Sequence, residues 1–218
     1  ILEKDSHEVF FVRRRELKNI PLIATIETLK NSYKKYVLIN SMPKEQRSLS
    51  SIIEILKEVE SNETHLFNKI WSEYPLKRDN ADAIRETLNK DLIPTHSKAL
   101  ILSALFLGLM KYYDEEKLLV LMENYTNCSD TECQLRSLIY MLLTLYLYER
   151  RAKVSKTVSE RASTMRECPN YKLDITSAQL LLIRSRNTDN ISRKVRDELM
   201  PKIMDMPQDL LSKIKGKD

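Results

Sequence analysis

Apolar residues recur along most of the chain at intervals of three and four residues, which is the spacing of a helix that buries one face. After Pro21, for example, Leu22, Ile26 and Leu29 fall on one helical face. No segment alternates between apolar and polar residues over the length of a strand, so the pattern predicts helices and no sheet. The segments predicted as helices are 21–37, 43–59, 66–74, 83–92, 94–110, 114–125, 130–148, 154–165, 175–186 and 189–200.

Two of these segments, residues 99–110 and 138–148, are apolar around nearly their whole circumference. A membrane-spanning helix needs about 20 apolar residues, and residues 99–110 are too few and are followed by the charged Lys111 and Asp114. A helix that is apolar on all sides is packed on both sides. We therefore predict that residues 99–110 form the central helix of a layered stack and that Asp114 caps the next helix.

The chain also contains a weak internal repeat. Residues 94–123 superpose on residues 129–158 at an offset of about 35 residues, so that Tyr113 falls on Tyr148 and Asp114 on Glu149. Each copy has a strongly apolar first helix, a tyrosine near its end, an acidic residue and an amphipathic second helix. A third pair follows in the predicted helices 175–186 and 189–200, the second of which we expect Thr188 and Asp189 to cap.

Helix pairs that repeat about every 34 to 47 residues are typical of α-solenoids. The sequence therefore predicts an all-α fold, a right-handed α-α superhelix of about ten helices in antiparallel pairs. The expected organisation is N-terminal helices over residues 1–74, a polar connection with a short helix over 75–93, and stacked helical pairs over 94–218.

The segment S-D-T-E-C-Q-L-R-S-L-I-Y-M-L-L, residues 129–143, resembles a HEAT repeat. In that family an Asp in the turn and an Arg six residues later bridge neighbouring repeats, which implies Asp130 and Arg136 as an inter-repeat pair. A partner would also offset the cost of burying the charge of Arg136 in an apolar run. The preceding pair has Thr95 and Ile101 at these positions, so the resemblance does not extend to a continuous ladder.

A broader resemblance covers residues 20–211 and is carried by I-P-T-H-S-K-A-L-I-L-S-A-L, K-Y-Y-D-E-E-K-L-L-V-L-M, Y-L-Y-E-R-R and V-R-D-E-L-M-P-K-I-M. These motifs are similar to the helical middle region of large bacterial tetratricopeptide-type proteins. The resemblance implies a scaffold without assigned chemistry. The small-residue positions of the tetratricopeptide consensus are largely missing, and we expect the chain, which begins at Ile1, to be a piece of a longer protein.

The amino-acid composition argues against several kinds of chemistry. The chain has only two glycines, Gly108 and Gly216, which excludes the glycine-rich loops that cradle phosphates. The three cysteines, Cys128, Cys133 and Cys168, have no zinc-like spacing and indicate free thiols in a reducing compartment such as the cytoplasm. No histidine stands at metal-ligand spacing, and Glu123, Asp130 and Glu149 are interpreted as solvated charges. We expect no metal, no cofactor and no catalysis.

The net charge of +5 and the basic clusters at residues 13–15, 150–156 and 184–196 leave nucleic-acid binding as an alternative. Acidic residues interrupt these clusters, as on an ordinary solvated face. Tyrosine is abundant and suits half-exposed binding surfaces. The candidate partner surface is Tyr112, Tyr113, Tyr140, Tyr146, Tyr148, Arg150, Arg151 and Lys153. The sequence thus predicts a non-catalytic helical-repeat scaffold that binds a protein or peptide, away from membranes, within a larger bacterial protein.

Overall fold

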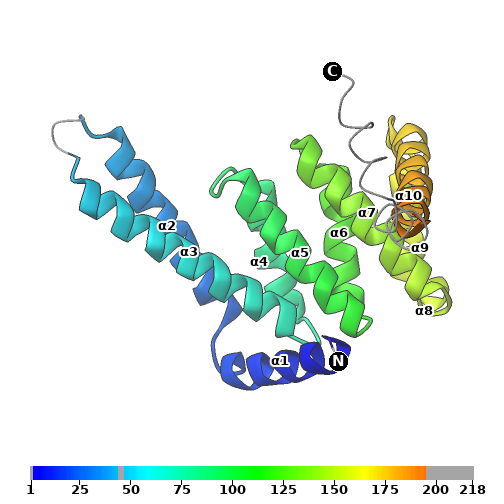
Figure 1. Cartoon of the computed structure of the whole chain (residues 1–218), viewed down its shortest axis with the longest axis horizontal. Coiled ribbons are helices and arrows are strands. Elements are labelled where there is room, and N and C mark those ends of the chain that lie inside the picture. The colour runs from blue at the N-terminus through cyan, green and yellow to red at the C-terminus, as the bar shows by residue number, and fades with distance from the viewer. Residues whose placement is uncertain (1, 44–46, 195–218) are drawn as a thin grey trace, which may run out of the picture. The chain divides into compact units, whose positions relative to one another are not determined.

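The computed structural model describes residues 2–43 and 47–194, and in these ranges the chain forms ten helices and no strand (Figure 1). The helices are α1 (Leu2–Leu17), α2 (Leu22–Ser41), α3 (Leu49–Ser72), α4 (Arg78–Asn89), α5 (Thr95–Lys111), α6 (Glu115–Asn127), α7 (Thr131–Leu147), α8 (Glu149–Val154), α9 (Lys156–Arg166) and α10 (Tyr171–Lys194). The prediction of an all-helical chain of about ten helices is confirmed. The chain divides into two compact units, Ile1–Pro169 and Asn170–Asp218, so that α10 belongs to the second.

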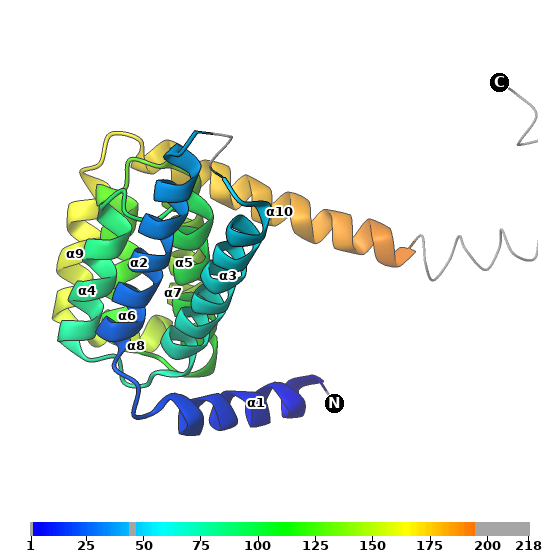
Figure 2. The ribbon, with the colours of Figure 1, turned by 90° about the vertical axis from the view of Figure 1, so that its left-hand side faces the viewer.

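Most helices of the first unit pack in two rows (Figure 2). In one row α3 contacts α5 and α5 contacts α7, and in the other row α2 contacts α4, α4 contacts α6 and α6 contacts α9. The contacts of α2 with α3, of α5 with α6 and of α6 with α7 join the two rows. Helix α1 lies across one end and packs on α3. The predicted connection at residues 75–93 lies within this unit and contains the whole of α4.

The apolar residues 99–110 lie in the middle of the stack, as predicted. Helix α5 packs against α3, α6 and α7, and its core residues Leu102, Leu105 and Leu109 are fully buried. A narrow stripe that includes Leu107 and Met110 is exposed, so the helix is covered on most of its circumference but not on all of it. Asp114 caps α6 as predicted, because its Oδ1 accepts the N–H of Lys117 at 3.3 Å.

Some predicted helix boundaries are wrong. The segments predicted at 43–59 and 66–74 contribute residues 49–59 and 66–72 to one helix, α3, because the polar residues between them include neither Pro nor Gly. The cap predicted at Thr188 and Asp189 does not exist, since α10 is continuous there. The rest of that predicted helix, from Val195 on, lies outside the described residues.

Two further differences from the prediction occur at the ends of the first unit. Helix α1 was not among the predicted segments; it is anchored by the buried Phe10, whose ring lies 5.6 Å from that of Trp71. Near the other end, Ser155 separates α8 from α9 and caps α9 by accepting the N–H of Val158 at 3.2 Å. Val154, predicted to begin the apolar stripe of the helix 154–165, is instead the last residue of α8 and is exposed.

A buried lysine connects three helices. Lys117 of α6 is 1% exposed, and its Nζ donates to the backbone oxygen of Ile70 at 2.9 Å and to that of Trp71 at 3.4 Å. These carbonyls belong to the last turn of α3, where a helix leaves its oxygens without intrahelical partners. To reach them, the lysine passes Gly108 of α5, where a Cβ would lie 2.5 Å from Nζ. One of the two glycines of the chain is thus needed for close packing.

The row of α4, α6 and α9 is linked by ion pairs. Glu123 accepts a hydrogen bond from Nε of Arg85 at 2.5 Å and forms an ion pair with Arg161 at 2.7 Å. Glu123 lies 38 residues after Arg85 and the same distance before Arg161. The side chain of Glu123 is only 14% exposed, so the interpretation of Glu123 as a solvated charge was wrong. Glu149, in contrast, is exposed and pairs with Lys153.

The packing of Gly108 predicts that Gly108→Ala lowers the free energy of unfolding by about 1–3 kcal/mol, because the new methyl group displaces the ammonium of Lys117. Urea unfolding followed by circular dichroism measures this change. In a Lys117→Met background the same substitution is expected to cost at least about 1 kcal/mol less. Equal costs in the two backgrounds would contradict the proposed contact.

The burial of Lys117 predicts a pH dependence of stability. Burial lowers the pKa of Lys117 from 10.5 to about 8. Between these values the unfolded chain binds a proton that the folded chain has released, so stability rises with pH. The free energy of unfolding of the wild type minus that of Lys117→Met should rise by about 2 kcal/mol between pH 8 and pH 10. Taking the difference cancels the other titrating groups, and a flat or falling difference would contradict the prediction.

Candidate functional site

A groove of about 1000 Å³ lies where α2 extends beyond its neighbour α4 (Figure 1). The two helices begin at the same end of the unit, because Leu22 and Asp79 line a common pocket there. Helix α2 has 20 residues and α4 has 12, so α2 is longer by about 12 Å. We call this site the α2 groove; it is lined by Tyr33, Lys34, Tyr36, Val37, Leu38, Ser41, Asp91, Leu92, Ile93, Pro94, Thr95, His96, Lys98, Ser129 and Asp130.

The wall formed by α2 is one continuous helical face. Lys34, Val37, Leu38 and Ser41 follow one another at the spacing that puts side chains on the same side of a helix. Val37 is 63% exposed and Leu38 is 60% exposed. Leu92, which is 41% exposed, lies in the loop between α4 and α5 on another wall. Apolar side chains are therefore open to solvent on more than one side of the groove.

A polar cluster centred on Tyr33 fixes the base of the groove. The hydroxyl of Tyr33 donates to Oε1 of Glu63 at 2.7 Å and lies 2.8 Å from Oγ of Ser97 and 3.0 Å from Nε2 of His96. Burial raises the pKa of Tyr33 well above its usual range, and the Glu63 carboxylate raises it further. The cluster joins α2, α3 and the start of α5, so it holds the walls of the groove in place.

The residue types of this cluster resemble those of a hydrolase, but the geometry differs. Ser97 is almost fully buried, and its hydroxyl donates to Glu63 at 2.5 Å. Nε2 of His96 lies beside Tyr33 and, at 3.2 Å, beside Glu63. A serine nucleophile needs a base in contact with its hydroxyl and room for a substrate. Here the hydroxyl is directed to a carboxylate in the core, which is the arrangement of a cross-link between helices.

The two carboxylates of the groove already have partners. Asp91 accepts from Nζ of Lys98 at 3.1 Å. Asp130 accepts the N–H of Cys133 at 3.0 Å and the hydroxyl of Thr95 at 2.7 Å. These two bonds, the first being the larger cause, lower the pKa of Asp130. Asp130 thus caps α7 and connects it to the start of α5, and it is not a freely solvated charge.

One ammonium group and one imidazole edge remain open in the groove. Lys34 is exposed, and no ion pair joins it to another residue in the part of the chain that the structure describes. The side chain of His96 is 65% exposed, with only Nε2 directed to the polar cluster. The carboxylate of Asp91 is 97% exposed but is already bonded to Lys98. The ammonium of Lys34 is therefore the charge that a ligand meets beside the apolar walls without an ion-pair partner among the described residues.

The structure does not bring the predicted inter-repeat pair together. Arg136 donates to Glu132 at 2.9 Å and to the hydroxyl of Tyr140 at 3.3 Å, both on its own helix. Asp130 bonds to Thr95 and Cys133 instead, as described above. The hydrogen bonds of Asp130 and Arg136 therefore go to different residues.

The predicted tyrosine surface is spread over several packing sites. Tyr112 lies 5.1 Å from the ring of Tyr74, Tyr113 lies 5.4 Å from that of Tyr148, and Tyr140 stacks on Phe106 at 4.3 Å. Only Tyr146 of the five is mostly exposed, at 83%. These rings pack mainly between helices and do not line one groove.

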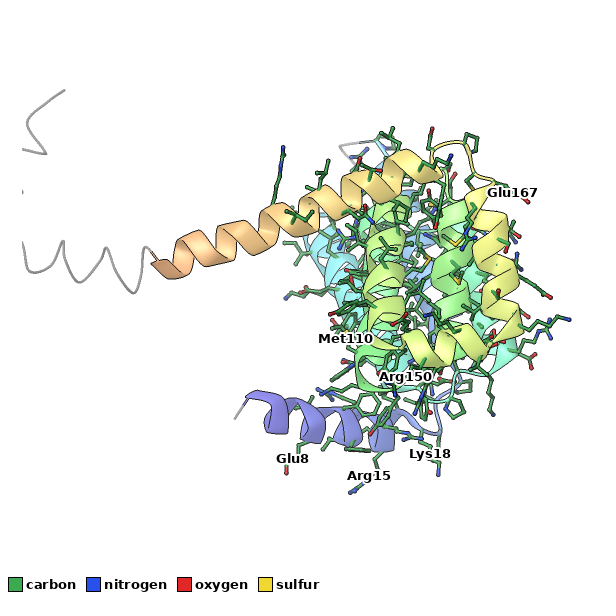
Figure 3. The ribbon with its side chains drawn as sticks, turned by 90° about the vertical axis from the view of Figure 1, so that its right-hand side faces the viewer. Glu8, Arg15, Lys18, Met110, Arg150 and Glu167 are labelled. Atoms are coloured by element: carbon green, nitrogen blue, oxygen red, sulfur yellow. The ribbon has the colours of Figure 1, made fainter. Side chains whose placement is uncertain are left out.

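The predicted basic part of the surface lies on α8. Arg150 and Arg151 are exposed, and Lys153 pairs with Glu149. Figure 3 shows Arg150 at the end of the first unit where Arg15 and Lys18 also lie. This is the end opposite the loops that form the α2 groove.

Lys34, Val37, Leu38, Leu92 and His96 were not among the predicted site residues. A signal for them existed in the unequal lengths of the predicted helices 21–37 and 83–92. The sequence did not show that these two helices are neighbours and begin at the same end of the unit. The difference in length creates a groove only when both conditions hold.

Other kinds of site find no support in the described part of the chain. It contains no group of His, Cys, Asp and Glu residues that could hold a metal ion. None of the helices described is long and apolar enough to cross a membrane. No protein-family model, curated protein or solved structure matches the chain.

The Tyr33 cluster predicts that Tyr33→Phe lowers the free energy of unfolding by about 1–2 kcal/mol, because Glu63 and Ser97 lose a buried partner. The matched control is Tyr146→Phe, which removes a hydroxyl from an exposed ring and should change stability by less than about 0.5 kcal/mol. Urea unfolding of both variants provides the comparison. Equal effects would show that the cluster does not hold the helices together.

Proposed function

We propose that this chain is a non-catalytic helical-repeat scaffold that binds a protein partner, within a larger bacterial protein. The repeat architecture is supported by the two rows of helices and by the Arg85–Glu123–Arg161 ladder, whose members recur at equal intervals. In α-solenoids each helical pair buries its apolar face against the next pair. A right-handed α-α superhelix of the HEAT or tetratricopeptide kind accounts for these features.

The observation that carries the binding role is the α2 groove. Val37, Leu38 and Leu92 expose apolar surface together in one concavity. Single exposed apolar residues are common, but several around one groove mark a site of interaction. The polar cluster beneath them holds the walls in a fixed arrangement, so a partner would find the groove already formed.

The alternative of nucleic-acid binding has weaker support. Phosphate binding depends on several unneutralised cations on one face. In the predicted basic clusters, Arg13 pairs with Glu16, and Lys153 and Lys156 pair with Glu149 and Glu160. Because acidic partners accompany these three cations, fewer positive charges are left for phosphate groups.

Site-specific photo-crosslinking in the cells that make the protein tests this function. A benzophenone amino acid at position 38, in the groove, should crosslink to a discrete protein. The same group at position 49, where Leu49 is 71% exposed outside the groove, should not. Crosslinks from position 38 to nucleic acid, together with salt-sensitive binding of labelled oligonucleotides, would favour the alternative. Identical crosslinks from both positions would contradict a role for the groove.

A further inference from the structure

The α2 groove has the shape of a missing helical segment. Along their row, α2 contacts α4 and α4 contacts α6. Because α4 ends at Asn89, the C-terminal part of α2 has no described helix beside it in this row. The uncovered length of about 12 Å corresponds to about two helical turns, or eight residues.

The side chains on the uncovered face have the spacing that a neighbouring helix requires. Lys34, Val37, Leu38 and Ser41 occupy positions i, i+3, i+4 and i+7 of α2. Helices that bind in grooves use the same spacing for their own apolar anchors. A helix lying here would cover Val37 and Leu38 with one face and would contact Leu92 of the opposite loop.

Charge decides which kind of helix fits. In the groove Asp91 is paired with Lys98, and Asp130 is engaged by Cys133 and Thr95. Lys34 and the exposed edge of His96 are left to interact with a ligand. Electrostatic complementarity therefore favours a partner with carboxylates on the side that faces these two residues.

We propose that the α2 groove binds a short acidic amphipathic helix of a partner protein, with its apolar side on Val37, Leu38 and Leu92 and its carboxylates directed to Lys34 and His96. This inference rests on the proposed scaffold function and specifies the chemistry of the partner. The bound helix would continue the row of α4 over the exposed end of α2.

The probe is a phage library of random twelve-residue peptides, selected on the wild-type protein and depleted on Leu38→Asp. Enriched peptides are synthesised with fluorescein and measured by fluorescence anisotropy. We expect them to carry a net negative charge and two large apolar residues three or four positions apart. Their affinity should fall as the salt concentration rises, since part of the attraction is between charges.

Two pairs of variants locate the binding site. Leu38→Asp should weaken binding at least tenfold and Lys34→Glu about fivefold. The matched controls Leu49→Asp and Lys57→Glu make the same changes on exposed positions of α3 outside the groove and should alter affinity less than twofold. Circular dichroism melts of all four variants show whether any loss comes from unfolding.

Three outcomes would overturn this inference: no enriched peptide, enriched peptides without net negative charge, or binding that Leu38→Asp does not weaken. These outcomes can be distinguished from a failure of the proposed function. A protein crosslinked from position 38 would still support the scaffold if the selected peptides were not acidic. The absence of both crosslinks and peptide binders would overturn both proposals.

Discussion

The placement of Lys117 is the interaction on which the arrangement of the first unit depends. A buried ammonium is costly unless polar groups replace its water. Here the carbonyls at the C-terminal end of α3 do so, and they carry the partial negative charge of the helix dipole. The contact forces α5 to present Gly108, the residue without a side chain, between α3 and α6. A single side chain thus sets the spacing of three helices from both rows. Lys69 acts in the same way on α1, since its Nζ donates to the backbone oxygen of Leu17 at 3.1 Å.

A different polar cluster joins α2, the middle of α3 and the start of α5. There Tyr33, Glu63 and Ser97 bond to one another across α2, α3 and α5. Lys117 and this cluster hold α3 and α5 together at two separate points, and the cluster also fixes α2 against them. The α2 groove lies beside this part of α2, because α4 is too short to cover it. The candidate site therefore follows from the packing of the helices and needs no reactive side chain.

The parts of this picture that could be predicted from sequence are those with a local cause. The apolar run in α5 and the cap at Asp114 depend on neighbours within a few residues. The low glycine content, in contrast, was interpreted only as excluding phosphate-binding loops. That Gly108 admits a lysine from α6 requires knowing which helices touch. Glu123 likewise looked solvated because both of its arginines lie 38 residues away.

Polar groups that hold the fold together differ in burial from those that are open to a ligand. Lys117 and Ser97 are buried, and the atoms that could bind a ligand are directed to partners within the fold. Lys34, in contrast, extends from the one part of α2 that α4 leaves uncovered, next to the exposed Val37 and Leu38. A cation beside apolar surface costs little in water and gains when a complementary group excludes that water. For this reason the groove, rather than the chemically richer cluster beneath it, is the place where the described chain is prepared to bind a partner.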